Sequence, residues 1–221
     1  MEETSVEGPT LPFPWNHLYN FVIFLLYKVL KINIILSLIS NIFWILMSFY
    51  CVKKYNEKYG SNDLMRFAYV TFGISVLNSC MALTEFFSEN IMTSMRTLLE
   101  LLQASLAVPC LTTEVWLKYE VAQKEVAWLH TAVGLIPTYI FLFQHYTRQD
   151  LIDFAIVMSM LSLLGVGFIY RDIYAIGSAM FTFLAYCIFF FRNEISYDQM
   201  SKQFYNYCMA FFTFCAYKSV I

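Results

Sequence analysis

Charged residues are scarce in this sequence and make up only 14% of its 221 residues. Soluble domains carry about 25% charged and about 45–50% apolar residues, whereas this chain is 59% hydrophobic and 19% aromatic. A water-soluble core of this length could not bury so much apolar surface, because a folded surface still needs polar groups to cover it. The composition argues against a soluble enzyme, a disordered chain and a secreted disulfide domain. We therefore expect an integral membrane protein.

The chain also lacks the patterns that mark other classes of protein. Its net charge is −2 and it has no basic block of the kind that follows nucleic-acid phosphates. Six cysteines form no CxxC pair and mostly lie inside apolar runs, which argues against a disulfide framework or a zinc ribbon. The first residues, from Met1 to Pro9, are acidic, whereas a signal peptide begins with basic residues.

Motifs for catalysis and metal binding are missing as well. The three histidines are scattered, and the sequence contains no HExxH, HxxxH or GxSxG motif and no cysteine–histidine cluster. A catalytic zinc site needs several protein ligands and an open position for water. We therefore predict no catalytic residue, no metal site and no other cofactor.

Long apolar runs indicate helices that cross a membrane, because a spanning helix needs about 20 mostly apolar residues. The sequence predicts an all-α, polytopic membrane protein, a bundle of seven transmembrane helices. The predicted spans are residues 33–52, 65–84, 94–117, 127–145, 151–170, 173–191 and 203–220. The connections at 146–150 and 171–172 are short, so the helices on either side should form antiparallel hairpins. Pro109 and Pro137 lie inside spans and predict kinks.

The segment before the first span has two interpretations. Residues 17–31 are mostly apolar but too few for a standard span, and Lys28 and Lys31 lie at the end of the segment. A helix on the membrane surface fits this pattern, and an eighth span is the alternative. We divide the chain into an acidic tail with an interfacial amphipathic segment (1–32) and a seven-helix domain (33–221). With seven spans, eight basic residues fall on one side and six on the other, which predicts a luminal or extracellular N-terminus and a cytosolic C-terminus.

Polar side chains inside the predicted spans are the candidate functional residues, because such groups are costly in hydrocarbon. Arg96, Glu100 and Gln103 are spaced i, i+4 and i+7 and so form one stripe of a helix. Counted along their spans, Asn78, Glu100 and Tyr207 should lie at nearly the same membrane depth. We therefore predict an intramembrane polar cluster that could bind lipid, made of Ser75, Asn78, Arg96, Glu100, Gln103 and Tyr207.

Structural roles are the alternative for the same residues. Glu100 and Arg96 could form an ion pair that reaches the membrane surface, and Asn78 and Gln103 could hydrogen-bond between helices. Ser40, Asn41, His130 and Asn206 are further polar groups within predicted spans.

The order of short motifs resembles a known superfamily. The segments that carry the resemblance are Ile39–Phe43, Leu77–Cys80, Leu99–Val108 and Phe204–Phe211. Together they resemble the seven-helix alkaline ceramidase and adiponectin-receptor-type proteins, nearest the branch that contains myomaker. The resemblance covers most of residues 39–217.

This resemblance implies a zinc site whose ligands have been replaced. The family's histidine of the second span matches Asn78, its aspartate of the third span matches Glu100, and its HxxxH pair matches Tyr207 and Phe211. Ser75 lies one residue from the position of the family serine. Tyrosine and phenylalanine are not ordinary zinc ligands. The resemblance therefore implies the family scaffold without its metal.

Three functions fit these observations. The favoured hypothesis is a non-catalytic membrane protein that binds membrane lipids or membrane-protein partners and no nucleic acid. The first alternative is a lipid amidase or other hydrolase with Glu100 as general base, since burial raises a carboxyl pKa toward neutrality. The second is a receptor or transporter, although the sequence lacks a DRY-like triplet, an NPxxY motif and glycine-broken spans.

Overall fold

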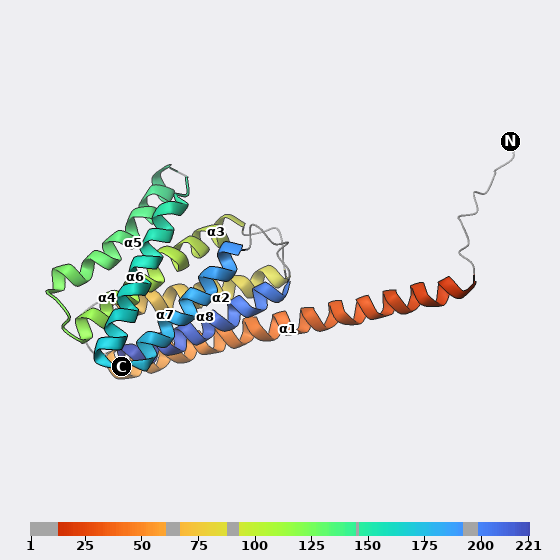
Figure 1. Cartoon of the computed structure of the whole chain (residues 1–221), viewed down its shortest axis with the longest axis horizontal. Helices are drawn as coiled ribbons and strands as arrows, with labels where there is room; N and C mark the ends of the chain where they lie inside the picture. Colours follow the sequence, from red (N-terminus) through yellow and green to blue (C-terminus); the bar gives the residue numbers. More distant parts are fainter. Residues whose placement is uncertain (1–12, 61–66, 88–92, 145, 192–198) are drawn as a thin grey trace.

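The computed structural model describes residues 13–60, 67–87, 93–144, 146–191 and 199–221. Within these ranges the chain is helical and has no strand, which confirms the all-α prediction. The helices are α1 (Phe13–Tyr59), α2 (Phe67–Phe87), α3 (Thr93–Leu102), the π-helical turn η1 (Gln103–Ala107), α4 (Val108–Lys118), α5 (Lys124–Gln144), α6 (Gln149–Tyr170), α7 (Ile173–Phe191) and α8 (Gln199–Val220). Because α3, η1 and α4 follow one another without a break, the described chain forms seven helical rods (Figure 1).

Five of these rods are long and apolar enough to cross a membrane, so the chain is a multi-pass membrane protein. They are Ile35–Tyr59, Phe67–Thr84, Leu98–Lys118, Lys124–Gln144 and Gln149–Tyr170. In α7 the described apolar stretch is shorter, Ile173–Cys187. Helix α8 (Gln199–Val220) covers the predicted residues 203–220, but its described part is not among the five helices that are long and apolar enough to cross a membrane.

Helix α1 differs from the expectation at its start. The expected division between residues 32 and 33 falls inside a single helix that runs from Phe13 to Tyr59. Between Pro14 and Gly60 the sequence has neither glycine nor proline, the residues that most readily end a helix. At 1.5 Å per residue the helix is about 70 Å long, more than twice the ~30 Å thickness of a bilayer core. Its N-terminal half extends beyond the other helices (Figure 1).

The two predicted hairpins are confirmed, since α5 packs on α6 and α6 packs on α7. At the tight turn between α6 and α7, Arg171 adopts a left-handed conformation with φ 56°. Asp172 then caps α7, because its Oδ1 accepts hydrogen bonds from the backbone N–H groups of Tyr174 and Ala175 (2.9 and 3.2 Å).

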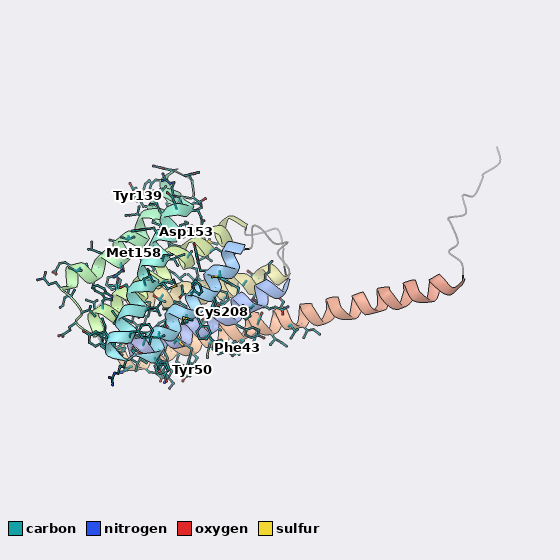
Figure 2. All side chains as sticks on the ribbon, in the orientation of Figure 1. Phe43, Tyr50, Tyr139, Asp153, Met158 and Cys208 are labelled. Atoms are coloured by element: carbon teal, nitrogen blue, oxygen red, sulfur yellow. The ribbon has the colours of Figure 1, made fainter. Side chains whose placement is uncertain are left out.

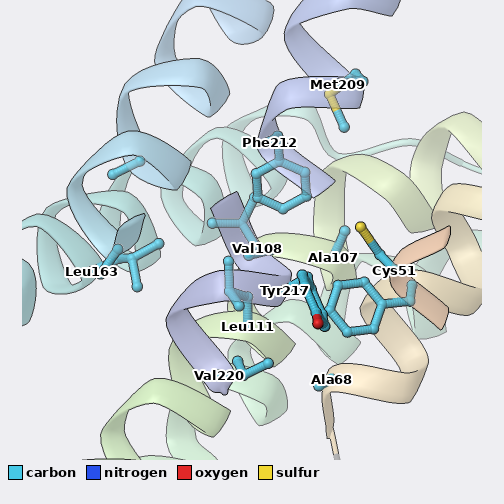
Figure 3. Close-up of a cluster of buried hydrophobic side chains, with 14 of the residues drawn as sticks. Cys51, Ala68, Ala107, Val108, Leu111, Leu163, Met209, Phe212, Tyr217 and Val220 are labelled. Atoms are coloured by element: carbon cyan, nitrogen blue, oxygen red, sulfur yellow. The ribbon is translucent and has the colours of Figure 1, made fainter. Parts of the chain in front are cut away.

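The core lies where α1, α2, α4 and α8 meet, with α6 and α7 completing it. Its largest fully buried side chains include Trp44, Tyr55, Phe72, Leu111 and Phe212, and Figure 3 shows part of this cluster. Outward-facing side chains on α5 and α6, such as Tyr139 and Met158, are also apolar or aromatic (Figure 2). In a membrane protein those outer faces contact lipid.

Candidate functional site: a polar layer at the π-helical turn

The rod made of α3, η1 and α4 is the central helix of the bundle. Helix α4 packs against α2, α5, α6 and α8, whereas α3 packs against α2. In the most apolar window of Leu98–Lys118, 78% of the residues are buried, compared with 22% for Lys124–Gln144. The predicted stripe of polar residues therefore lies on the most enclosed helix.

This rod departs from α-helical geometry at η1. Pro109 has no backbone N–H, and in a regular α-helix its ring collides with the carbonyl of the residue four positions earlier, here Ser105. The wider π-helical turn ends at Ala107, two residues before the proline, and includes Ser105. Gly134 of α5 packs against the Ser105 carbonyl so closely that a Cβ at position 134 would overlap its oxygen. The predicted irregularity at Pro109 thus takes the form of a π-turn, while α5 continues through Pro137.

One hydrogen bond fixes how α2 lies against η1. The Thr71 hydroxyl donates to the carbonyl oxygen of Ala107 at 2.9 Å. Ser75 is one turn further along α2, and Gln103 is one turn back along the central rod. Because the two helices run antiparallel, these one-turn steps bring Ser75 level with Gln103.

Asn78 and Glu100 are the next members of the same two stripes. Asn78 follows Thr71 at i+7 and Glu100 precedes Ala107 by seven residues, so the two come level one turn beyond Ser75 and Gln103. Asn78 is buried, with 5% exposure. Glu100 is half-buried and takes part in further interactions.

Gln103 and Ser75 are buried without hydrogen-bond partners. Gln103 is 3% exposed, and neither its Nε2 nor its Oε1 has a partner among the described residues. Ser75 is fully buried, and its Oγ is likewise unpartnered. Leaving a buried polar group unsatisfied costs about 1–3 kcal/mol. We call Ser75, Asn78, Glu100 and Gln103 the polar layer.

Helix α1 adds another unpartnered group near this level. Tyr55 of α1 packs against Phe72 of α2 with ring centroids 5.5 Å apart. Ser48 precedes Tyr55 by seven residues, which is about 10 Å of helix, and this places it near the level of Ser75 and Asn78. Its Oγ is buried and has no partner within the described ranges. Sequence reasoning missed Ser48, because a serine in an apolar run carries little signal.

Of the two remaining residues of the predicted cluster, one is not described at its side chain and the other lies elsewhere. The backbone of Arg96 is in α3, but its side chain lies outside the described part of the structure. Tyr207 packs on Phe43 of α1, and Phe211 packs on both Phe43 and Phe181. The two positions that the family resemblance matches to its HxxxH pair thus belong to an aromatic cluster.

Several buried polar groups elsewhere in the bundle have hydrogen-bond partners on a neighbouring helix. The Asn206 amide of α8 donates to Asn41 Oδ1 (2.7 Å) and to Ser40 Oγ (3.1 Å) of α1. In α4, the Thr113 hydroxyl bonds the Ala127 carbonyl of α5 at 3.0 Å. These contacts have the interhelical role that polar side chains commonly take in membranes.

Glu114 is an intramembrane carboxylate that the sequence analysis did not select. It is buried in α4, and its Oε1 accepts a hydrogen bond from the Tyr55 hydroxyl at 3.2 Å. Its position inside the predicted third span was a sufficient signal, since intramembrane ionisable groups are functional candidates by default. Tyr55 and Glu114 both take part in further interactions.

Lysines secure the end of α8. The Lys118 ammonium of α4 donates to the Ser219 carbonyl at 2.7 Å, and the Lys58 ammonium of α1 donates to the Ile221 carbonyl at 2.9 Å. Cations at a helix C-terminus are favourable because the helix dipole is negative there.

Beside these lysines, Tyr119 holds the capping residue of α7. Its hydroxyl donates to Asp172 Oδ2 at 2.9 Å. Burial raises the pKa of Tyr119, and the neighbouring Asp172 carboxylate adds to the rise, to about 12. This end of the bundle is thus fixed by satisfied contacts.

No family model, curated protein or solved structure matches this chain in the three comparisons. Within the described residues, no group of three or more His, Cys, Asp or Glu side chains could hold a metal ion. The geometry of the polar layer is therefore the basis for a functional proposal.

Proposed function

We propose that this protein is a non-catalytic, multi-pass membrane protein that binds a membrane lipid at the polar layer. The observation that carries the proposal is the Gln103 carboxamide, which is buried in the central helix and has no hydrogen-bond partner for either polar atom in the described part of the chain. A carboxamide supplies two N–H donors and a carbonyl acceptor. A bound molecule that completes these hydrogen bonds would recover the cost of burying them.

Comparison with another buried amide, Asn206, argues against a purely structural role for Gln103. Asn206, which is also a buried amide, has two side-chain partners on α1. Gln103 faces α2 across a layer that contains Ser75 and Asn78, yet it bonds to neither. A group retained only to join helices should have a partner on the neighbouring helix.

The position of the layer supports a lipid as the bound molecule. Gln103 lies ten residues after Thr93, where α3 begins, so it is about 15 Å along the rod and within a stretch apolar enough to cross a membrane. Beyond η1 the rod continues as α3, whose neighbour is α2. A headgroup or backbone of a lipid could reach this depth while its acyl chains stay in the surrounding hydrocarbon.

The test is lipid retention by the purified protein. Wild type, Gln103→Leu and the matched control Gln144→Leu, an exposed position at the end of α5, are purified from one cell type in mild detergent. Lipid extraction and mass spectrometry should find a lipid at near-stoichiometric amount in wild type and in the control, and a strong depletion in Gln103→Leu. Equal lipid profiles in all three samples would overturn the proposal. Release of a cleaved lipid by the wild type would favour the hydrolase instead.

We also propose seven spans, with α7 and α8 as the sixth and seventh, and a cytosolic C-terminus. Antiparallel packing of α7 on α8 supports this number. The lysines that secure the end of α8, Lys58 and Lys118, belong to the more basic side of the chain. Protease protection of a C-terminal tag in sealed microsomes tests the orientation, and digestion only after detergent is added would contradict it.

A further inference from the structure

We infer that the ligand group bound at Gln103 is uncharged and presents a hydrogen-bond donor and an acceptor side by side, as in a fatty-acid glycerol ester or a fatty-acid ethanolamide. This inference rests on the proposed function and specifies the chemistry of the lipid.

The first argument is the nature of the unpartnered atoms. Among the residues that the structure describes, the donor group and the acceptor of Gln103 have no partner, and Ser75 adds a hydroxyl that can act as either. The two ends of a carboxamide are adjacent, so a single ligand group with a neighbouring donor and acceptor can satisfy both ends. An ester carbonyl alone would leave the acceptor of Gln103 unpaired.

The second argument is charge. Gln103 and Ser75, which would contact the ligand group, carry no formal charge, and the ionisable member of the layer, Glu100, lies one turn away and as a carboxylate would repel a phosphate. A buried ion without a compensating charge is far more costly than a buried neutral group. A phosphate or a quaternary ammonium would therefore gain hydrogen bonds here only by losing its hydration. A hydroxyl beside an ester, or an amide beside a hydroxyl, loses much less on leaving water.

The third argument is depth. Gln103 lies about 15 Å along its rod from Thr93, by the rise of an α-helix, and within a stretch apolar enough to cross a membrane. Charged groups at such depth are rare in membrane spans unless they are paired. A small neutral headgroup can enter further than a phosphate, which needs the aqueous interface.

The test is ligand binding to the full-length protein in detergent, followed by native mass spectrometry. The probes are 1-oleoylglycerol and oleoylethanolamide, compared with methyl oleate, which has an acceptor but no donor, and with phosphatidylcholine. At least one of the first two should bind wild type at least tenfold more tightly than methyl oleate and phosphatidylcholine, and the tighter of the two identifies the source of the group. Gln103→Leu should lose at least tenfold in that affinity, and Gln144→Leu should bind as wild type does.

A second variant keeps the inference testable if Gln103→Leu does not fold. Ser75→Ala removes a hydroxyl with little change in volume and should weaken the preferred probe severalfold while methyl oleate is unaffected. Preferential binding of phosphatidylcholine that depends on Gln103 would overturn this inference and leave the proposed function standing. Binding of every probe to the same extent, with or without Gln103, would overturn both.

Discussion

Replacing Gln103 with leucine should stabilise the lipid-free protein, which is an unusual result for a buried polar residue. Both polar atoms of its carboxamide are buried without partners among the described residues, and each such group costs about 1–3 kcal/mol. Leucine has a similar volume and an equal or better helix propensity. The substitution therefore removes the cost of burial without opening a cavity. We expect a gain of about 1–3 kcal/mol in the free energy of unfolding.

The assay is thermal unfolding in lipid-stripped detergent, followed by intrinsic tryptophan fluorescence. On the scale of soluble proteins of this size, 1 kcal/mol corresponds to about 2–4 °C in Tm, so Gln103→Leu should unfold several degrees above wild type. Asn206→Leu is the matched comparison, because that amide has partners at 2.7 and 3.1 Å. Its loss should lower the free energy of unfolding by about 0.6 kcal/mol, the average for interhelical hydrogen bonds in a membrane protein, and by no more than about 1.7 kcal/mol.

Bound lipid should change the order of the Tm values of wild type and Gln103→Leu. A ligand that binds only the folded state stabilises it by RT ln(1 + [L]/Kd), which is about 2.7 kcal/mol at a hundredfold excess over Kd. Wild type should gain this stabilisation when the lipid is restored, and Gln103→Leu should gain little. A lower Tm for Gln103→Leu in lipid-free detergent would refute the reasoning, since it would mean that the native carboxamide already has favourable partners.

The remaining predictions concern packing and pH. Gly134→Ala should destabilise the protein by about 1–3 kcal/mol, because the new Cβ would overlap the backbone oxygen of Ser105. Gly73→Ala is the control, since no atom lies within 4 Å of its new Cβ, and it should be neutral or slightly stabilising in the same Tm assay. Tyr119, whose pKa is raised to about 12 beside Asp172, should contribute its stability fully below pH 10 and lose it as the pH rises toward 12. Tm measured from pH 8 to pH 12 should therefore fall more steeply in wild type than in Tyr119→Phe, and parallel curves would contradict the assignment.

Much of the fold was predictable from the sequence because hydrophobicity and length determine where helices form in a membrane protein. The rods at 65–84, 94–117 and 151–170 and the tight turn at 171–172 all appear close to the predicted positions. The uninterrupted α1 was not predicted, although the absence of glycine and proline between Pro14 and Gly60 was visible. Lysine side chains suggested a boundary there, but lysine is a good helix former and does not end a helix.

The lateral arrangement of the helices could not be predicted from the same pattern. Lipid-facing and core-facing positions are both apolar, so hydropathy does not separate Leu46, which is 64% exposed, from Trp44, which is 1% exposed. The bond from Asn206 to Asn41 joins residues 165 positions apart. Helical periodicity gives the face of each residue but not the helix that this face meets.

For the candidate site, the spacing of Glu100 and Gln103 predicts that they share one face of a helix. Counting residues along the second and third spans predicts that this pair lies at the same height in the bundle as Ser75 and Asn78. The inclusion of Tyr207 was a weaker inference, because equal depth does not imply a shared interior. Tyr207 instead packs on Phe43. The neighbours of a side chain depend both on its depth and on the rotation of its helix about its own axis, and counting residues gave only the depth.

The unpartnered groups of the bundle differ in what they imply. Trp44 and Trp116 each leave only an indole N–H without a partner in the described structure, and a large ring contributes mostly through its apolar contacts. Gln103 has no such compensation, since its polar atoms make up the end of its side chain. It also opens the π-turn, and π-turns occur frequently at functional sites. Pro109 accounts for the departure from α-helical geometry, but nothing in the described packing offsets the cost of the unsatisfied amide at the start of that turn. The ligand that we propose would recover this cost by hydrogen-bonding the amide.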